Sequence, residues 1–309
     1  MMLAQQPNLV GALLGTSTEK YGVPITHTPR NYQAFPGSKY ALPHDTEEQQ
    51  RLLLQHHTLK SLFENRILLC PVSLDKSDKV LEIGTGPGLW IMDLASTVDP
   101  SVPMVAVDIE PRLFPTSPPK NIEFRVESVT NLPADWTNTF SLIHQRLLIL
   151  ALQVPQWPKA ISEHYRVLRP GGWIQLAECT PWHEGKYPGK PCMEKLTGLY
   201  RRLAEHRNLY VDCVYDIPKM LEAAGFVDIQ RESRMQLLGK WAGDIGAANA
   251  INHVGVFRGI KTPVLEAGGF GVVASSEEYD ALLEGLDKEW NEIPGSEKDF
   301  IITWARKPL

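Results

Sequence analysis

The segment Val80–Gly88 constrains the fold of this chain more than any other. It reads Val-Leu-Glu-Ile-Gly-Thr-Gly-Pro-Gly, and an apolar stretch from Leu89 to Ala95 follows it. Glycines that follow a short apolar run let the backbone turn sharply and approach a ligand, and the next helix then presents free N–H groups. The segment therefore predicts a strand, a tight turn and a helix, which is the repeating unit of a parallel α/β sheet.

The rest of the chain continues this alternation. Short apolar runs separated by helical patterns predict strands at residues 79–83, 104–108, 122–126, 140–144, 173–177, 226–230 and 300–304. The sequence thus predicts a Rossmann-like, seven-stranded, mostly parallel sheet. Four prolines between Pro111 and Pro119 predict that the second crossover helix is lost or very short. The last strand, 300–304, is predicted to join the sheet as an edge.

Four segments make up the predicted organisation. Residues 1–75 form an N-terminal arm and a helix that cover the site, 76–235 the α/β core, 236–297 a helical insertion that acts as a lid, and 298–309 the last strand. The first helix starts at the cap residues Asp45 and Thr46, and Leu52, Leu53, Leu59, Leu62 and Phe63 predict an apolar face for it.

Charge and composition exclude several classes of function. The net charge is −5 over 309 residues, so no basic excess favours nucleic acid as a partner. No stretch reaches the roughly 18 apolar residues of a membrane span. The first fifteen residues lack the charged start of a signal peptide, and the four cysteines show neither CxxC pairs nor metal-ligand spacing. We expect a cytoplasmic protein with reduced thiols, with the nucleus as the alternative, and no bound metal. The sequence gives no prediction of oligomeric state.

The position of Asp108 indicates what the glycine turn binds. Asp108 ends the second strand, twenty residues after Gly88, where a carboxylate can accept hydrogen bonds from both hydroxyls of a ribose. NAD is the obvious competitor, but its fingerprint G-x-G-x-x-G needs a glycine where this chain has Leu89. Glu82 beside the turn would repel a pyrophosphate and suits a cationic amino-acid ligand. The charges therefore favour S-adenosyl-L-methionine (SAM) as the cofactor.

With these motifs the chain resembles the class I SAM-dependent methyltransferases. The resemblance rests on the E-x-G-x-G-x-G turn, on Asp108, on the strand at 140–144 and on the Arg-Val-Leu-Arg-Pro-Gly-Gly run at 166–172. It is closer still to the fungal LaeA-like branch, which is related to the trans-aconitate methyltransferases. Members of that branch carry an arm similar to residues 32–57 here, and an end similar to Trp304–Pro308.

The resemblance implies a role for each matching position. The turn would line the methionine moiety, Glu82 would orient its amino group, Asp108 would hold the ribose and Ile109 would lie against the adenine. Ser128 stands where many relatives have an adenine-binding Asp, so the adenine amino group would be held by Ser128, by its neighbour Glu127 or by the backbone of Val129. Gln145 and Arg146, just after the fourth strand, would contact the methionine part. Tyr40 and His56 on the arm would close over the cofactor. The implied cofactor residues are Tyr40, His56, Glu82, Gly84, Thr85, Gly86, Gly88, Asp108, Ile109, Ser128, Val129, Gln145 and Arg146. Structural roles remain open for some of them, such as an ion pair for Arg146.

The acceptor end is predicted from residues near the carboxyl edge of the sheet. A hydroxyl acceptor gains from a general base, for which histidine is the usual choice. We predict His183 as that base, since it follows the fifth strand, and His144, Glu178, Trp182 and His253 as residues that border the acceptor. A thiol or amine acceptor would need no base.

Three functions compete at this stage. The first is methyl transfer to an oxygen or nitrogen of a small molecule, in particular a secondary metabolite. The second is a LaeA-like regulator that acts through protein partners. The third is a methyltransferase fold that binds SAM but catalyses another reaction, such as a cyclisation.

Overall fold

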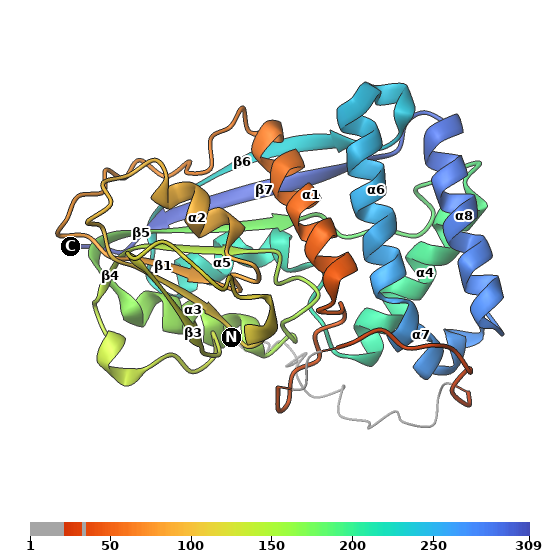
Figure 1. The fold of residues 1–309 in the computed structure, drawn as a ribbon, viewed down its shortest axis with the longest axis horizontal. Helices are drawn as coiled ribbons and strands as arrows, with labels where there is room; N and C mark the ends of the chain where they lie inside the picture. The colour runs from red at the N-terminus through yellow and green to blue at the C-terminus, as the bar shows by residue number, and fades with distance from the viewer. Residues whose placement is uncertain (1–21, 33–34) are drawn as a thin grey trace, which may run out of the picture.

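A single seven-stranded sheet organises the chain (Figure 1). The computed structural model describes residues 22–32 and 35–309. The strand order is β3-β2-β1-β4-β5-β7-β6, and β1 to β5 run parallel while β7 is antiparallel to both of its neighbours. The strands are β1 (Val80–Ile83), β2 (Met104–Asp108), β3 (Ile122–Val126), β4 (Phe140–Arg146), β5 (Leu168–Cys179), β6 (Val227–Leu237) and β7 (Glu297–Arg306). The predicted Rossmann-like fold class is confirmed.

Alternating side chains give the sheet two buried faces. Leu81 and Ile83 of β1 belong to one apolar cluster, together with residues of α3 (Gln156–Val167) and α5 (Cys213–Ala223). Val80 belongs to the other cluster, with residues of α2 (Leu89–Ala95) and the end of α1 (Thr46–Leu62). A parallel sheet is stable only when helices cover both of its faces, and this chain meets that requirement. Between β2 and β3 there is only the short 3₁₀ turn η1 (Pro111–Leu113), as the prolines predict.

The place of β7 corrects the sequence prediction. The last strand is not an edge: it lies between β5 and β6, and β6 is the edge strand. Residues 300–304 are all buried, and a strand that is buried along its length belongs inside a sheet. Most residues of β6 are exposed or only half-buried, as suits a strand with one free side.

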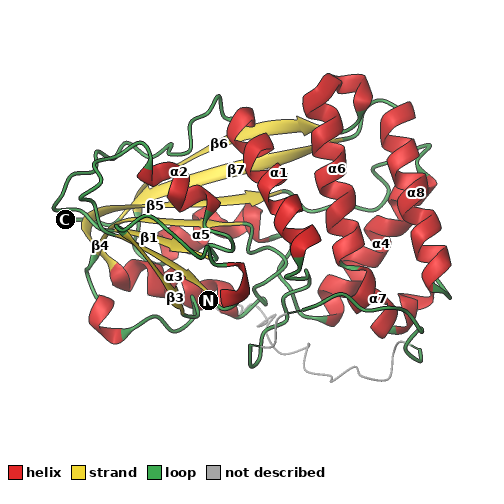
Figure 2. Ribbon diagram, in the orientation of Figure 1, coloured by secondary structure: helices red, strands yellow, loops and turns green. Residues whose placement is uncertain are grey.

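A layer of helices lies beside the end of β6 and the start of β7 (Figure 2). We call it the helical layer; it contains α1, α4 (Pro191–His206), α6 (Gly243–Gly259), α7 (Lys261–Glu266) and α8 (Ser276–Glu292). Three further 3₁₀ turns are η2 (Ala134–Trp136), η3 (Lys240–Ala242) and η4 (Gly268–Gly271). Ser275 caps the start of α8, since its hydroxyl accepts from the Glu278 N–H at 3.2 Å. None of the described helices is long and apolar enough to cross a membrane.

The buried side of α1 is polar, contrary to the prediction of an apolar face. Leu59 is buried, but Leu53 is 45% exposed. The other buried side chains of the helix are Glu48, Arg51, Gln55, His56 and Thr58. The predicted start is right, because the Asp45 side chain accepts from the Glu48 N–H at 3.0 Å. This buried face is therefore held by an ion pair and hydrogen bonds as well as by apolar contacts.

The arm that precedes α1 is fixed at several points along its described part. The Ile25 N–H donates to the Leu265 carbonyl at 2.9 Å, and the Tyr32 hydroxyl donates to the Gly259 carbonyl at 2.5 Å. Further along, the Ala41 N–H donates to the carbonyl of Leu150 at 3.1 Å. The arm therefore runs from the helical layer to the loop that follows β4. The predicted N-terminal segment also includes residues 1–21 and 33–34, which lie outside the described part.

Candidate functional site

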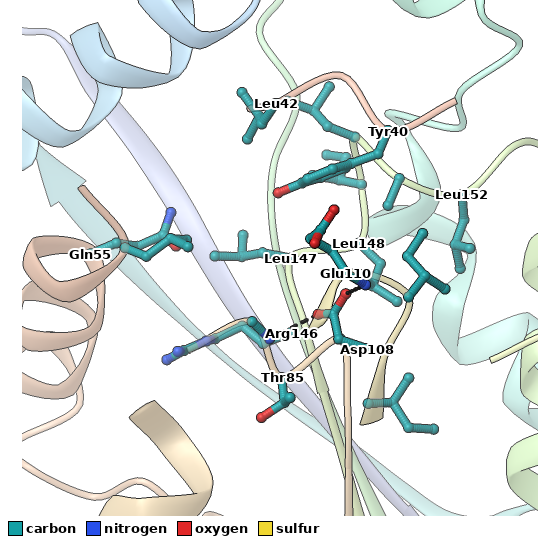
Figure 3. A pocket seen from close by; sticks show the side chains of 18 of the residues that line it. Tyr40, Leu42, Gln55, Thr85, Asp108, Glu110, Arg146, Leu147, Leu148 and Leu152 are labelled. Carbon is teal, nitrogen blue, oxygen red and sulfur yellow. Dashed lines mark hydrogen bonds between the residues drawn. The ribbon is translucent and has the colours of Figure 1, made fainter. Parts of the chain in front are cut away.

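One cavity of about 300 Å³ lies between the carboxyl ends of the strands, the arm and the helical layer. Figure 3 shows Tyr40 and Leu42 of the arm on one side of it, Thr85 and Asp108 on the opposite side, and Gln55 of α1 reaching in from the flank. Its lining joins residues from both ends of the chain, from the arm to β7.

The glycine turn forms one wall. Gly84, Gly86 and Gly88 have φ angles of +65°, +51° and +75°, a region in which glycine has no steric penalty. At Gly88 a Cβ would lie 2.6 Å from the Phe124 ring. Gly84, Thr85 and Gly86 line the cavity, whereas Gly88 starts α2 behind it.

Asp108 lies beside this turn at the end of β2. Its carboxylate accepts from the Gly86 N–H at 2.8 Å and from the Glu110 N–H at 3.0 Å. Burial raises the pKa of Asp108 to about 6, and these backbone hydrogen bonds oppose that rise. The carboxylate is thus held at the cavity wall by the backbone on either side of it.

Glu82 and His144 form a buried pair behind the turn. The Thr85 hydroxyl donates to Glu82 at 2.5 Å, and His144 Nδ1 lies 3.6 Å from the other Glu82 oxygen. Burial raises the pKa of Glu82 to about 7 and lowers that of His144, so the histidine is neutral. The His144 ring stacks on Trp90, with 3.6 Å between ring centroids. Glu82 lines the cavity, but His144 points to the α2 face of the sheet and, contrary to the prediction, does not border it.

Residues after β2 and β3 form the wall at the predicted adenine position. Ile109, Ser128 and Val129 line the cavity there, as do Glu110 and Thr130, which the sequence analysis missed. The hydroxyls of Ser128 and Thr130 lie 3.0 Å apart and share a hydrogen bond. Glu110 stands two positions after Asp108, and Thr130 stands two positions after Ser128. A polar residue at this spacing from a predicted contact was the signal that could have found them.

Of the residues predicted near the methionine moiety, Tyr40 and Arg146 line the cavity. His56 does not: its Nε2 lies 3.2 Å from Asp93, and its Nδ1 lies 3.4 Å from the Arg146 guanidinium. Burial, followed by the charge of Arg146, lowers the pKa of His56 to about 4, so it is neutral and accepts from Arg146. Gln145 is also outside the lining, because successive strand residues face opposite sides. Both side chains therefore support the site from behind instead of facing the cavity.

Glu178 occupies a structural position, contrary to the prediction that it borders the acceptor. Its carboxylate accepts from the N–H groups of Leu148 at 2.7 Å and Ile149 at 3.3 Å. It is 1% exposed, and burial raises its pKa to about 8. Glu178 thus holds the loop after β4, whose leucines line the cavity.

His183, the predicted base, also lies outside the cavity lining. Its Nδ1 is 2.7 Å from the Arg201 guanidinium, and its Nε2 is 3.4 Å from the Tyr215 hydroxyl. The neighbouring Trp182 takes the inward position, so His183 points the other way. Among the predicted acceptor residues, Trp182 and His253 line the cavity, and their rings meet edge to face at 5.5 Å between centroids.

The inner end of the cavity contains residues that the sequence analysis missed. They come from four separate elements and surround Trp182 and His253: Tyr200 of α4, Gln236 of β6, Asn252 of α6 and Lys298 of β7. The sequence around these four residues gave no signal, because their meeting depends on the pairing of β6 with β7 and on the packing of α6.

Several known proteins are similar to this chain in sequence. The methyltransferase domain family matches residues 80–172. The N-methyltransferase sirN of Leptosphaeria maculans is 28% identical over 281 residues, which cover 89% of this chain and 96% of the relative. The methyltransferase grgD of a Penicillium species is 31% identical over 196 residues, or 60% of this chain and 68% of the relative. The secondary metabolism regulator LAE1 of Gibberella fujikuroi is 28% identical over 90% of both chains.

The similarity to sirN and to LAE1 spans about nine tenths of this chain. The chain belongs to the class I SAM-dependent methyltransferases, in the fungal LaeA-like branch.

Proposed function

We propose that this protein transfers the methyl group of SAM to a nitrogen of a small organic acceptor of fungal secondary metabolism. The observation that carries the proposal is the single cavity that runs from Asp108 and the glycine turn to an inner end at Trp182 and Lys298. The glycine end would take the cofactor, and the inner end would take the acceptor. The choice of nitrogen follows the name of sirN, and an oxygen acceptor is the alternative.

The residues at the glycine end fit the cofactor. Asp108 would accept from the ribose hydroxyls, and Ile109 and Val129 would lie against the adenine. Glu82, with its pKa near neutrality, would bind the amino group of the methionine part, and Tyr40 would cover it. SAM supplies an electrophilic methyl group on a positively charged sulfur.

The protein's own contribution is then to position the acceptor and exclude water. The transfer forms a bond between the acceptor nitrogen and the methyl carbon as the bond from that carbon to sulfur breaks, and S-adenosylhomocysteine (SAH) leaves. Such a displacement depends mainly on alignment of the three atoms. Trp182 and His253 would contact the acceptor, and the arm with α1 and α6 would close the space above it.

The place of the reaction is part of the same proposal. All four cysteines are free thiols in the described residues, which fits a reducing compartment such as the cytosol. A regulator that acts through protein partners in the nucleus would instead be found there.

The experiment follows the methyl group. The protein is incubated with methyl-labelled SAM and a desalted extract of the host cell supplemented with its organic-soluble metabolites. Label is then counted in the organic and the macromolecular fractions, with Asp108→Ala as the blank. We expect label in the organic fraction, which also provides the product for identification.

Other outcomes decide against this proposal. Label in protein would favour a regulator of the kind that LAE1 is named for. Label in neither fraction, together with SAH binding by the wild-type protein, would favour a reaction other than methyl transfer.

A further inference from the structure

The inner end of the cavity holds a buried cation that no carboxylate neutralises. Lys298 is 5% exposed and lines the cavity. Within residues 22–32 and 35–309, no ion pair or hydrogen bond reaches its Nζ; the contact it makes is with the Trp182 ring, whose centroid lies 3.6 Å away. A buried ammonium without a counter-ion is costly, so a group that neutralises it would bind favourably there.

The charges around Lys298 are compatible with a protonated amine. Burial lowers its pKa to about 8, the nearby Cys179 thiol opposes this and Arg201 adds to it. At neutral pH the side chain therefore remains mostly charged. Its position is fixed because Lys298 pairs with Gln236 at the start of β7.

Most polar groups at the inner end of the cavity already have hydrogen-bond or ion-pair partners within the protein. The Gln236 amide nitrogen donates to Asn249 at 3.2 Å, and its oxygen lies 3.4 Å from His253 Nε2. Arg51 is neutralised by Glu48 at 2.6 Å, and it also donates to the Asn252 amide oxygen at 2.8 Å. This leaves the Asn252 amide nitrogen as a second donor at the inner end, with no hydrogen-bond partner among the described residues.

We propose that Lys298 and the Asn252 amide bind an oxyanion carried by the acceptor, so that the substrate is an acid: a carboxylate, or an acidic enol or phenol. The donors face the cavity from β7 and α6, and the Trp182 ring supplies an apolar surface for the body of the same molecule. This inference rests on the proposed function, because the acceptor would occupy the cavity beside the cofactor.

The test uses matched probes on protein saturated with SAH. Binding of benzoate and of its neutral isostere benzamide is titrated by ligand-observed NMR, and 4-nitrophenolate is compared with 4-nitroanisole in the same way. We expect at least one anion to bind about tenfold more tightly than its neutral partner, as a charged hydrogen bond provides. The pair that shows the preference identifies the kind of oxyanion.

The variant Lys298→Met should abolish this preference, while Lys298→Arg should keep part of it. Lys288→Met is the matched control, because Lys288 is an exposed lysine of α8 outside the cavity lining. If Lys298→Met does not fold, the wild-type preference and its persistence in Lys298→Arg still test the proposal.

SAH binding, measured on the same samples, separates the two proposals. Equal affinity for anions and neutral isosteres on wild-type protein that binds SAH would overturn the oxyanion site alone. A preference that persists in folded Lys298→Met would overturn the role of Lys298. Failure of the wild-type protein to bind SAH would instead count against the proposed function.

Discussion

Asp108 is held by two backbone N–H groups, and its remaining lone pairs face the cavity. The change Asp108→Asn removes the charge and replaces one acceptor by a donor. Since hydrogen bonds to a charged group contribute about 1.5–3 kcal/mol, we expect SAH to bind roughly 10- to 100-fold more weakly. Isothermal titration calorimetry measures this. Asp99→Asn, in an exposed turn, is the control, and unchanged SAH affinity in Asp108→Asn would disprove the ribose role.

Glu82 makes cofactor binding depend on pH. Burial raises its pKa to about 7, so the carboxyl is largely neutral at pH 6 and largely charged at pH 8. The charged form attracts the amino group of the ligand. We therefore expect the SAH affinity of the wild-type protein to rise between pH 6 and pH 8, and Glu82→Gln to reduce that rise. Parallel pH profiles for the two proteins would contradict the assignment.

The predictable residues of the site are those that depend on local sequence. The glycine turn and Asp108 follow from a strand, its turn and the next strand, which neighbour one another in parallel pairing. Lys298 and Asn252 lie more than a hundred residues further along, and they reach the cavity only through the register of β7 and the packing of α6. His183 shows the opposite error: it follows the right strand, but its side chain points away from the cavity.

At the scale of elements, α1 is a helix whose buried face carries an ion pair. Glu48 and Arg51 are 1% and 8% exposed and bind each other through two hydrogen bonds. We expect Glu48→Ala to lower the free energy of unfolding by about 3–5 kcal/mol, because it leaves the Arg51 charge buried and unpaired. Chemical denaturation measures the change.

The neighbouring Glu47→Ala serves as the comparison. Glu47 is exposed, and an exposed ion pair contributes at most about 1 kcal/mol. A cost for Glu48→Ala as small as that of Glu47→Ala would show that water reaches the Arg51 guanidinium.

Helices and strands were predictable from periodicity, but their neighbours were not. The leucines of α1 predict a helix correctly, yet its buried side is the polar one, because α1 borders a cavity and α6 instead of the core alone. The apolar run at 300–304 predicts a strand, and its complete burial is the reason why it lies inside the sheet. Local patterns predict the kind of element, and not always which of its side chains are buried or what buries them.

For the whole molecule, these buried titratable groups predict that stability is greatest between about pH 4.5 and pH 6.5. His56 and His164 have pKa values lowered by burial to about 4 and about 3, so their contribution is complete above 6.5 and is lost as the pH falls. Glu82 and Glu178 have pKa values raised by burial to about 7 and about 8. Their contribution is complete below about 4.5 and is lost as the pH rises through these values.

Glu178 has the highest of these carboxyl pKa values and so accounts for the loss between pH 7 and 8. Thermal unfolding of the ligand-free protein should show Tm falling over that interval, and Glu178→Gln should flatten the fall, whatever its effect on Tm itself. Glu222→Gln, on an exposed position of α5, should leave the slope unchanged. An identical slope in Glu178→Gln would refute the linkage.

The position of β7 between β5 and β6 has a consequence for biosynthesis. During synthesis the residues of β1 to β6 are made before residues 297–306, and β6 then has no strand in the sheet to pair with, because its neighbour there is β7. Lys298 arrives with that same strand. The sheet and the inner end of the cavity therefore depend on the same strand, and a chain released before this strand is made would have neither.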